Sequence, residues 1–259
     1  MTELLNDIDE AKDWRGNDID CAACEHEDLL AAHKCELMRA CVHDRYARRI
    51  DRFFDWNPEH ANRYIGHAHF EVRAIAAKHA DVFSLPPLLK DPDETVRWNA
   101  ARRLPSKYLL DLRQDPHREV RIRVAQRLDD ADLVEMLADP DYYVRLVIAR
   151  RIGPALLLRL RLDPEAEVRR VVASRIGPDW AATMMEDADD GVRLEVARCV
   201  APALLGRMKD DPDWRARHAV AERIAVDQVA EFTDDPDPMV REAALGRLGA
   251  AESQGARLQ

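Results

Sequence analysis

Four of the five cysteines in this chain of 259 residues are clustered near its N-terminus, namely Cys21, Cys24, Cys35 and Cys41. Their spacing is C-x2-C-x10-C-x5-C. Four thiolates brought together by a compact fold can hold either a 4Fe-4S cluster or a tetrahedral zinc ion. Structural zinc sites usually use two short C-x-x-C pairs, whereas here one such pair is followed by a long gap and a wider pair. The spacing therefore favours an iron-sulfur cluster and leaves zinc as the alternative.

Three histidines, His26, His33 and His43, alternate with these cysteines along the chain. An imidazole could replace one thiolate, but four cysteines already complete a ligand set. We therefore expect the histidines to be solvated or to support the ligands from outside the ligand set.

The start of the chain gives the setting for these thiols. The first residues, MTELLNDIDEAKDW, are acidic and contain no apolar run, so they do not resemble a signal peptide. No stretch of about 18 apolar residues occurs anywhere, so we expect no membrane span. We predict a cytoplasmic protein, in which clustered thiols indicate a metal centre and not disulfides.

An arginine that returns at a constant spacing is the second candidate for chemistry. Its eight copies are Arg73, Arg97, Arg121, Arg145, Arg169, Arg193, Arg217 and Arg241. A row of guanidinium groups could bind phosphates, but the chain has a net charge of -10 and repels a polyanion. Pairing with an aspartate of the same or an adjacent repeat, or with carbonyls at the end of a neighbouring helix, explains why lysine never replaces it. We expect a structural ladder, with phosphate binding as the alternative.

Motifs of known enzyme classes are absent. The sequence has no phosphate-binding glycine loop, no nucleophile elbow and no HExxH, and it contains nine glycines in all. Cys199 has no positioned base among its neighbours in the sequence, so we interpret it as a structural residue. We predict that the protein is not an enzyme and takes no small-molecule substrate.

A repeat positions the recurring arginines. In seven of the eight copies an aspartate precedes the arginine at the same distance, and in the first copy His67 replaces this aspartate. The seven aspartates are Asp91, Asp115, Asp139, Asp163, Asp187, Asp211 and Asp235. The numbering of these aspartates gives a period of 24, and a fixed period of this length indicates a solenoid whose units bury their apolar faces against each other. Residues 67–250 are therefore predicted to form eight such repeats.

The repeat at 91–114 predicts two helices. Asp91 is expected to cap the first helix, with Pro92 at its first position and Pro105 after its end. Val96, Ala100, Ala101 and Leu104 form its apolar stripe, and Ala101 has an equivalent alanine in seven of the eight copies, which indicates a close contact between units. Leu109 and Leu112 are separated by a spacing of three, which is typical of a short 3-10 helix and not of a strand.

The pattern DPxxxVRxxAARRLPxxxLLxL over residues 67–250 resembles the leucine-rich repeat variant family. The resemblance implies an all-α fold, a right-handed superhelical solenoid that alternates α-helices and short 3-10 helices. It also implies a small N-terminal domain that binds a 4Fe-4S cluster, with Cys21, Cys24, Cys35 and Cys41 matching its cysteines. Departures from the pattern are Ala188 for proline, Ala216 for valine and Cys199 for arginine.

The domain organisation follows from these patterns. Residues 1–66 are predicted to form the cluster domain, of which 43–66 can be read as a degenerate repeat with Arg49 at the ladder position. The aromatic residues of that stretch are expected to pack between the domain and the array. Residues 251–259 are expected to be a frayed tail.

Two functional classes remain open. The first is a redox or sensing protein that docks a protein partner through the repeat surface. The second is an interaction scaffold in which a 4Fe-4S or zinc centre is purely structural. Nucleic-acid binding through the arginines is a distant third, because the net charge favours a protein partner.

Overall fold

The structure is a computed structural model that describes the backbone of residues 10–257 and side chains as far as Ala251. Contacts divide the chain into a first unit ending at Asp129 and a second beginning at Asp130. Both are helical, and the described residues contain no strand, only three isolated bridges between Lys12 and Asp18, Asp13 and Asp44, and Glu36 and Ala40. The prediction of an all-α repeat fold is confirmed.

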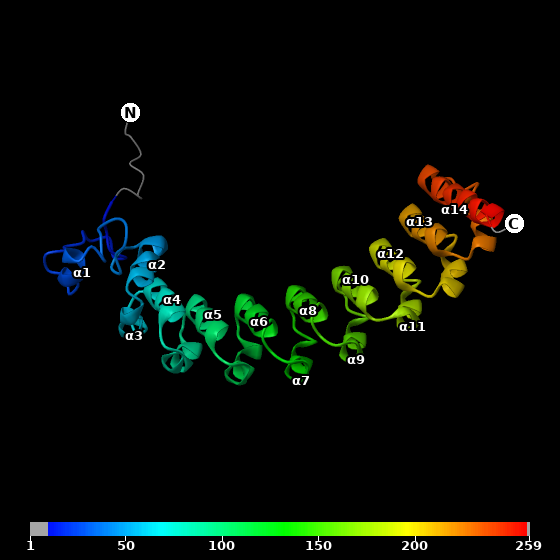
Figure 1. The fold of residues 1–259 in the computed structure, drawn as a ribbon. Coiled ribbons are helices and arrows are strands. Elements are labelled where there is room, and N and C mark those ends of the chain that lie inside the picture. The colour runs from blue at the N-terminus through cyan, green and yellow to red at the C-terminus, as the bar shows by residue number, and fades with distance from the viewer. Residues whose placement is uncertain (1–9, 258–259) are drawn as a thin grey trace, which may run out of the picture. The chain divides into compact units, whose positions relative to one another are not determined.

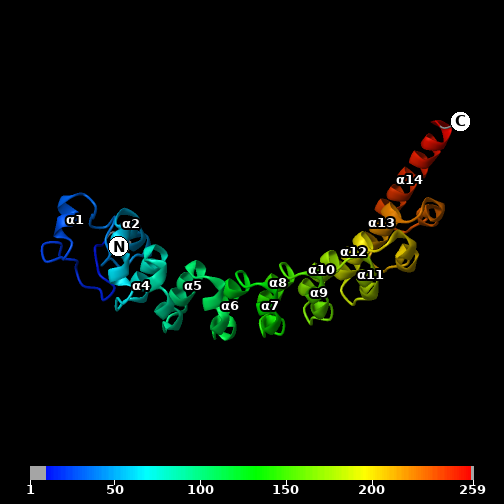
Figure 2. The same cartoon turned by 60° about the horizontal axis from the view of Figure 1, so that its bottom comes forward.

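Within each unit, longer helices stand side by side and short helices follow them along one edge (Figures 1 and 2). The first unit contains α1 (Glu27–Ala31), α2 (Ala47–Trp56), η2 (Pro58–His60), α3 (Ala61–Tyr64), α4 (Phe70–His79), η3 (Val82–Ser84), η4 (Pro86–Lys90), α5 (Glu94–Arg103), η5 (Ser106–Tyr108), η6 (Leu110–Gln114) and α6 (Arg118–Ala125), where η denotes a 3-10 helix. The second contains α7 (Asp130–Leu133), η7 (Val134–Met136), α8 (Tyr142–Ala149), α9 (Pro154–Leu157), η8 (Leu158–Leu160), α10 (Ala166–Arg175), α11 (Pro178–Ala181), η9 (Ala182–Met184), α12 (Asp190–Cys199), η10 (Pro202–Met208), α13 (Trp214–Arg223), η11 (Val226–Phe232) and α14 (Pro238–Arg257).

The long helix of each repeat begins later than the sequence suggested. In the repeat at 91–114, Asp93 and not Asp91 is the N-cap, and its carboxylate accepts the amide hydrogen of Thr95 at 2.8 Å. Asp91 accepts the amide hydrogen of Asp93 at 2.9 Å and so shapes the turn before the helix. Pro92 therefore lies outside the helix. The expected cap was wrong because the Asp91 carboxylate is held by an arginine of the preceding repeat.

The apolar stripe forms the core between neighbouring helices. Val144, Ile148, Ala149 and Ile152 are all fully buried, and the equivalent residues are also buried in the other repeats except the last, where Leu245 is exposed and Leu248 is partly exposed. Behind them, the leucines at the short helices, such as Leu157, are buried as well. The second short helix was predicted correctly, although in α7, α9 and α11 it begins with one α-helical turn.

Six of the recurring arginines link their own repeat to the next one within a unit. Arg97 donates from Nε and Nη2 to the two carboxylate oxygens of Asp115, at 2.7 and 2.9 Å. Its Nη1 donates to the carbonyl oxygens of Asp91 and Pro92, at 2.9 and 3.0 Å. The same four bonds are made by Arg73, Arg145, Arg169, Arg193 and Arg217. The expected structural ladder is confirmed for these six.

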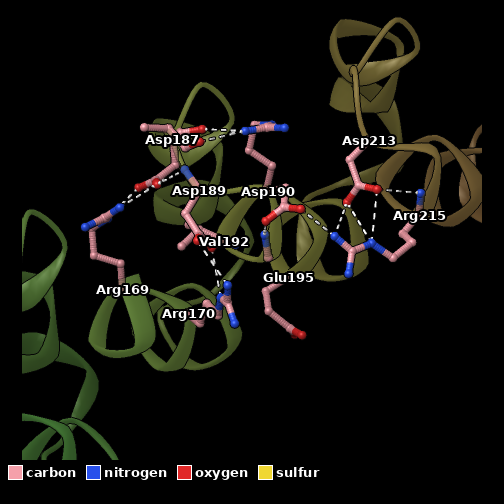
Figure 3. A network of polar contacts seen from close by, with 12 residues as sticks. Arg169, Arg170, Asp187, Asp189, Asp190, Val192, Glu195, Asp213 and Arg215 are labelled. Atoms are coloured by element: carbon pink, nitrogen blue, oxygen red, sulfur yellow. Dashed lines mark hydrogen bonds and ion pairs between the residues drawn. The ribbon is translucent and has the colours of Figure 1, made fainter. Parts of the chain in front are cut away.

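Figure 3 shows one rung of this ladder, Arg169 with Asp187, beside more exposed pairs that lie outside it. Arg170 pairs with Asp189, and Arg215 reaches both Asp190 and Asp213. Because each ladder guanidinium uses four of its five N–H groups within the protein, little of it remains for a phosphate.

A second row of arginines, placed later in six of the eight repeats, lies near the ends of the helices. Arg223 donates to the carbonyl oxygens of Ala197 and Val200 at 2.6 and 2.8 Å, at the end of α12. Arg247 does the same for α13. These bonds satisfy carbonyls that have no partner inside their own helix. The sequence pattern shows the arginines but does not reveal this function.

The last helix corrects one further expectation. The frayed tail was predicted for residues 251–259; of these, 251–257 continue α14, and 258–259 lie outside the described residues. The stop found in other repeats, such as Pro105 after α5, has no equivalent here, and the segment contains alanine, glutamate, glutamine and arginine, which favour helix. No described helix has an apolar stretch that could cross a bilayer.

Candidate metal centre

The first cysteine pair lies in the turn before α1. The Asp20 carboxylate accepts the amide hydrogen of Ala22 at 2.9 Å, so this side chain folds the backbone around Cys21. The Cys24 carbonyl accepts the amide hydrogen of Glu27, the first residue of α1, at 3.3 Å. The two cysteines are thus fixed by local contacts on either side.

The second pair is set side by side by a narrow hairpin. Glu36 and Ala40 exchange two backbone hydrogen bonds of 2.9 and 2.8 Å, and Met38 at the tip has a left-handed φ of 62°. Cys35 and Cys41 stand just outside this bonded pair, one on each arm of the hairpin. Their thiols lie close enough to influence each other's ionisation.

The four thiols share one region of the first unit. The ionisation of Cys21 and Cys24 is opposed first by burial and also by the nearby Cys41, so the pKa of each thiol is raised. The hydrogen bond between Cys35 and Cys41 lowers the pKa of Cys35 and, together with burial, raises that of Cys41. Such a group ionises fully only when positive charge is placed among the sulfurs, which is what a metal centre supplies.

By number alone, four thiols can serve either a cluster or a single ion. Among the described residues, no three side chains of His, Cys, Asp or Glu converge closely enough to hold one metal ion. A zinc site needs four donors about 2.3 Å from one point. A 4Fe-4S cube attaches each cysteine to a different iron, so its ligands must surround a shared volume instead of meeting at a point.

A partly buried hydrogen-bond chain begins at Glu25, the residue after Cys24. The Tyr64 hydroxyl donates to the Glu25 carboxylate at 2.7 Å, and the Nε2 of His26 lies 2.5 Å from the same hydroxyl oxygen. The bond from Tyr64 is the largest influence on Glu25 and lowers its pKa, while burial is the main cause of the raised pKa of Tyr64. Nothing in the sequence pointed to this chain of bonds, because Tyr64 and Glu25 lie far apart in the sequence.

The three histidines between the cysteines differ in position. His33 is exposed and, with a left-handed φ of 57°, lies in the turn after α1. His43 is half-buried and approaches Glu25 at 3.8 Å. His26 is buried against Phe53, so of the two expected positions, solvated or supporting the ligands from outside the ligand set, the solvated one does not apply to it. Burial lowers the pKa of His26 and favours its neutral form.

Residues in α2 and on either side of it hold the cysteine loops in place. Asn57, after α2, donates from Nδ2 to the carbonyl oxygen of Lys34 at 2.8 Å, next to Cys35. Asp44, fully buried, donates its amide hydrogen to the carbonyl oxygen of Cys41 at 3.4 Å and accepts a 3.0 Å bond from Arg49. The loops that carry the cysteines therefore depend on α2 and its flanking residues for their position.

Aromatic side chains join this region to the first full repeat, as predicted. Phe53, Phe54 and Tyr64 are buried, and the ring of Phe54 stacks on that of His79 in α4 with centroids 5.9 Å apart. Residues 47–64 form a long helix followed by short ones, which is the pattern of a repeat. The predicted domain boundaries at 66 and 250 remain predictions.

Comparison with known proteins places these features in a family. The family described as "LRV protein FeS4 cluster" matches residues 11–63. This family match supports the cluster and gives no support to zinc, the alternative left open by the spacing. A solved structure titled "A leucine-rich repeat variant with a novel repetitive protein structural motif" is 40% identical, with a TM-score of 0.85, and the match covers 89% of this chain and 99% of that one. A protein of Rhodobacter capsulatus, "Uncharacterized 27.7 kDa protein in nifB 3'region", is 48% identical over 99 residues. That match spans 38% of this chain and 40% of the relative.

Proposed function

The chain belongs to the leucine-rich repeat variant family, and we propose on that premise that Cys21, Cys24, Cys35 and Cys41 together hold its 4Fe-4S cluster. The observation that carries the proposal is the gathering of four thiols in one region of residues 11–63, the segment that matches the iron-sulfur family. Cys199 lies in α12 of the second unit and takes no part.

The cluster serves a redox or sensing function in this proposal, without an enzymatic reaction. When bound, a 4Fe-4S cluster supplies reversible transfer of one electron. The chain's own residues fix the ligands: Asp20 shapes the loop at Cys21, the hairpin aligns Cys35 with Cys41, and Tyr64 holds the residue after Cys24. The repeats offer a long surface for a protein partner in the cytoplasm.

The alternative is a scaffold in which the cluster is only structural. The contacts of Asn57 and Asp44 with the cysteine loops favour it, because they would couple cluster binding to the folding of α2. Nucleic-acid binding stays third, since the ladder arginines spend their hydrogen bonds on aspartates and carbonyls.

A reductive titration of the anaerobically purified protein, followed by electron paramagnetic resonance, tests the proposal. The protein should be brown and should contain iron and acid-labile sulfide in equal amounts. A reversible one-electron signal within the physiological range of potentials supports the redox function. A cluster that gives no such signal supports the scaffold, and a preparation with zinc and no sulfide would refute the cluster itself.

A further inference from the structure

Protein covers the four thiols unevenly. Cys35 and Cys41 are 8% and 3% exposed, whereas Cys21 and Cys24 are only partly buried. Electron transfer weakens steeply with distance through protein, so the side of Cys21 and Cys24 offers the shortest route between the cluster and a partner.

A hollow of about 230 Å³ opens on that side, and Cys24 forms part of its lining. Carboxylates surround it: Asp13, Asp18, Asp20 and Glu25. Trp14 lines it too and is 38% exposed. The hollow thus combines access to one thiol, an aromatic surface and a negative rim.

Nearby cations offset only part of this negative charge. Lys12 approaches Asp18 at 3.3 Å, but that carboxylate is 92% exposed, so the pair is well screened by water. Arg63 approaches Glu25 at 3.7 Å, and the guanidinium of Arg15 lies 4.6 Å from the ring centroid of Trp14. Asp20 is exposed and its carboxylate bonds a backbone amide, that of Ala22. Such a rim raises the local concentration of positively charged partners and lowers that of anions.

We propose that electrons enter and leave the cluster across this hollow, and that the redox partner presents a positively charged surface to its carboxylates. The inference rests on the proposed redox function. In the reducing direction the partner loses one electron and the cluster gains it; in the other direction the partner is a one-electron acceptor. No bond is formed or broken between the two proteins.

Two oxidants of opposite charge test this inference. The dithionite-reduced protein, freed of dithionite, is mixed in a stopped-flow instrument with hexaamminecobalt(III), a trication, or with tris(oxalato)cobaltate(III), a trianion. At low ionic strength the cation should react about 10- to 100-fold faster than the anion after allowance for their driving forces. This preference should collapse near 1 M salt, where the Debye length is about 3 Å. Hexaamminechromium(III), a redox-inert trication, should inhibit the reaction with the cation saturably.

A matched pair of variants separates the hollow from the overall charge of -10. Asp18→Asn with Asp20→Asn removes two carboxylates of the rim, and asparagine keeps the oxygen that accepts the Ala22 amide. Asp210→Asn with Asp234→Asn removes two exposed carboxylates of the second unit, for which the described residues show no hydrogen bond or ion pair. The rim variant should lower the cation-to-anion rate ratio about three- to tenfold, while the second variant should change it little.

Reduction potentials measured for each variant show whether a rate change reflects access or driving force. Equal effects of the two double variants, or a wild-type protein that reacts with both oxidants alike, would overturn the inference while leaving the cluster and its redox signal intact. Absence of a reversible signal in the wild-type protein would instead refute the proposed function beneath it.

Discussion

Arg145 binds the carboxylate of Asp163 with two parallel hydrogen bonds, from Nε at 2.7 Å and from Nη2 at 2.9 Å, across the boundary between two repeats. Their side chains are 9% and 2% exposed. Arg145→Ala should therefore lower the free energy of unfolding by about 3 kcal/mol, because it leaves a buried carboxylate without its partner. Urea denaturation followed by circular dichroism measures this.

Arg145→Lys should restore only part of the loss, since an ammonium group cannot match the two-pronged geometry. Arg159→Ala, at an exposed position of the same unit, is the control and should stay within about 0.5 kcal/mol of the wild type. If Arg145→Ala behaved like this control and also abolished salt-sensitive binding to nucleic acid, the ladder would be a phosphate site after all.

The ladder also predicts how stability depends on acidity. The hydrogen bond from Arg217 is the main cause of the lowered pKa of Asp235, and at Asp187 burial, which alone would raise the pKa, is outweighed by the bonds from Arg169 and a backbone amide. A carboxyl whose folded pKa is depressed stabilises the fold above its unfolded pKa of about 3.8 and loses that contribution as the pH falls through the folded value. The ladder should therefore cause little change in the thermal midpoint between pH 7 and pH 5. At pH values below about 4, the thermal midpoint should fall.

Asp235→Asn isolates this contribution from other acid effects, including those on the cluster. The variant should be less stable than the wild type at pH 6. This difference in stability should shrink as the pH falls through the range in which the Asp235 carboxyl of the wild type becomes protonated. A difference that stayed constant down to about pH 2 would show that the ion pair contributes nothing through its charge.

Cys199 occupies the place of a helix-capping arginine. Its thiol lies 3.2 Å from the carbonyl oxygen of Ala173, at the end of α10, and burial raises its pKa so that it remains a neutral, weak donor. Cys199→Arg should restore the bonds that Arg223 makes one repeat later and raise the free energy of unfolding by about 1 kcal/mol. Arg223→Cys is the reverse experiment and should lower the free energy of unfolding by a similar amount. If chemical denaturation showed that both variants changed the free energy of unfolding in the same direction, the capping role would be contradicted.

The cysteine assignment predicts a contrast between two serine variants. Cys41→Ser should lose most of the iron and sulfide, because serine is a poor ligand for iron. Cys199→Ser should keep both. Iron and acid-labile sulfide per chain, with the visible absorption spectrum, measure the outcome, and retention of the full complement by Cys41→Ser would remove it from the ligand set.

The alanine of the apolar stripe sets a limit on side-chain size between repeats. Ala149 is fully buried, whereas Leu245, its equivalent in the last repeat, is 58% exposed. Ala149→Leu should lower the free energy of unfolding by about 1–3 kcal/mol through overpacking. Leu245→Ala should change it by less than about 0.5 kcal/mol. If urea denaturation gave similar changes in the free energy of unfolding for Ala149→Leu and Leu245→Ala, the stack of repeats would be shown to adapt to the larger side chain.

Local sequence patterns were enough to predict the repeat architecture and the candidate ligands of the metal centre. The period of 24, the stripe at Val96 and Ala100 and the spacing of Leu109 and Leu112 depend only on helix geometry, which acts over short stretches of chain. The pairing of the recurring arginine with an aspartate could also be predicted, because only a guanidinium binds a carboxylate with two parallel hydrogen bonds. These features were therefore accessible before the structure was known.

Contacts between distant segments were decided only in the folded chain. Asp91 looked like a helix cap, yet the guanidinium of Arg73 competes for its carboxylate and the cap passes to Asp93. The sequence left open whether His26 is solvated, and contacts with Phe53 and Tyr64, both distant in the sequence, decide that it is buried. Burial is a property of the whole neighbourhood in space, so the spacing of four cysteines predicts a cluster, while the fold alone determines that Cys24 lines an acidic hollow and Cys41 is enclosed.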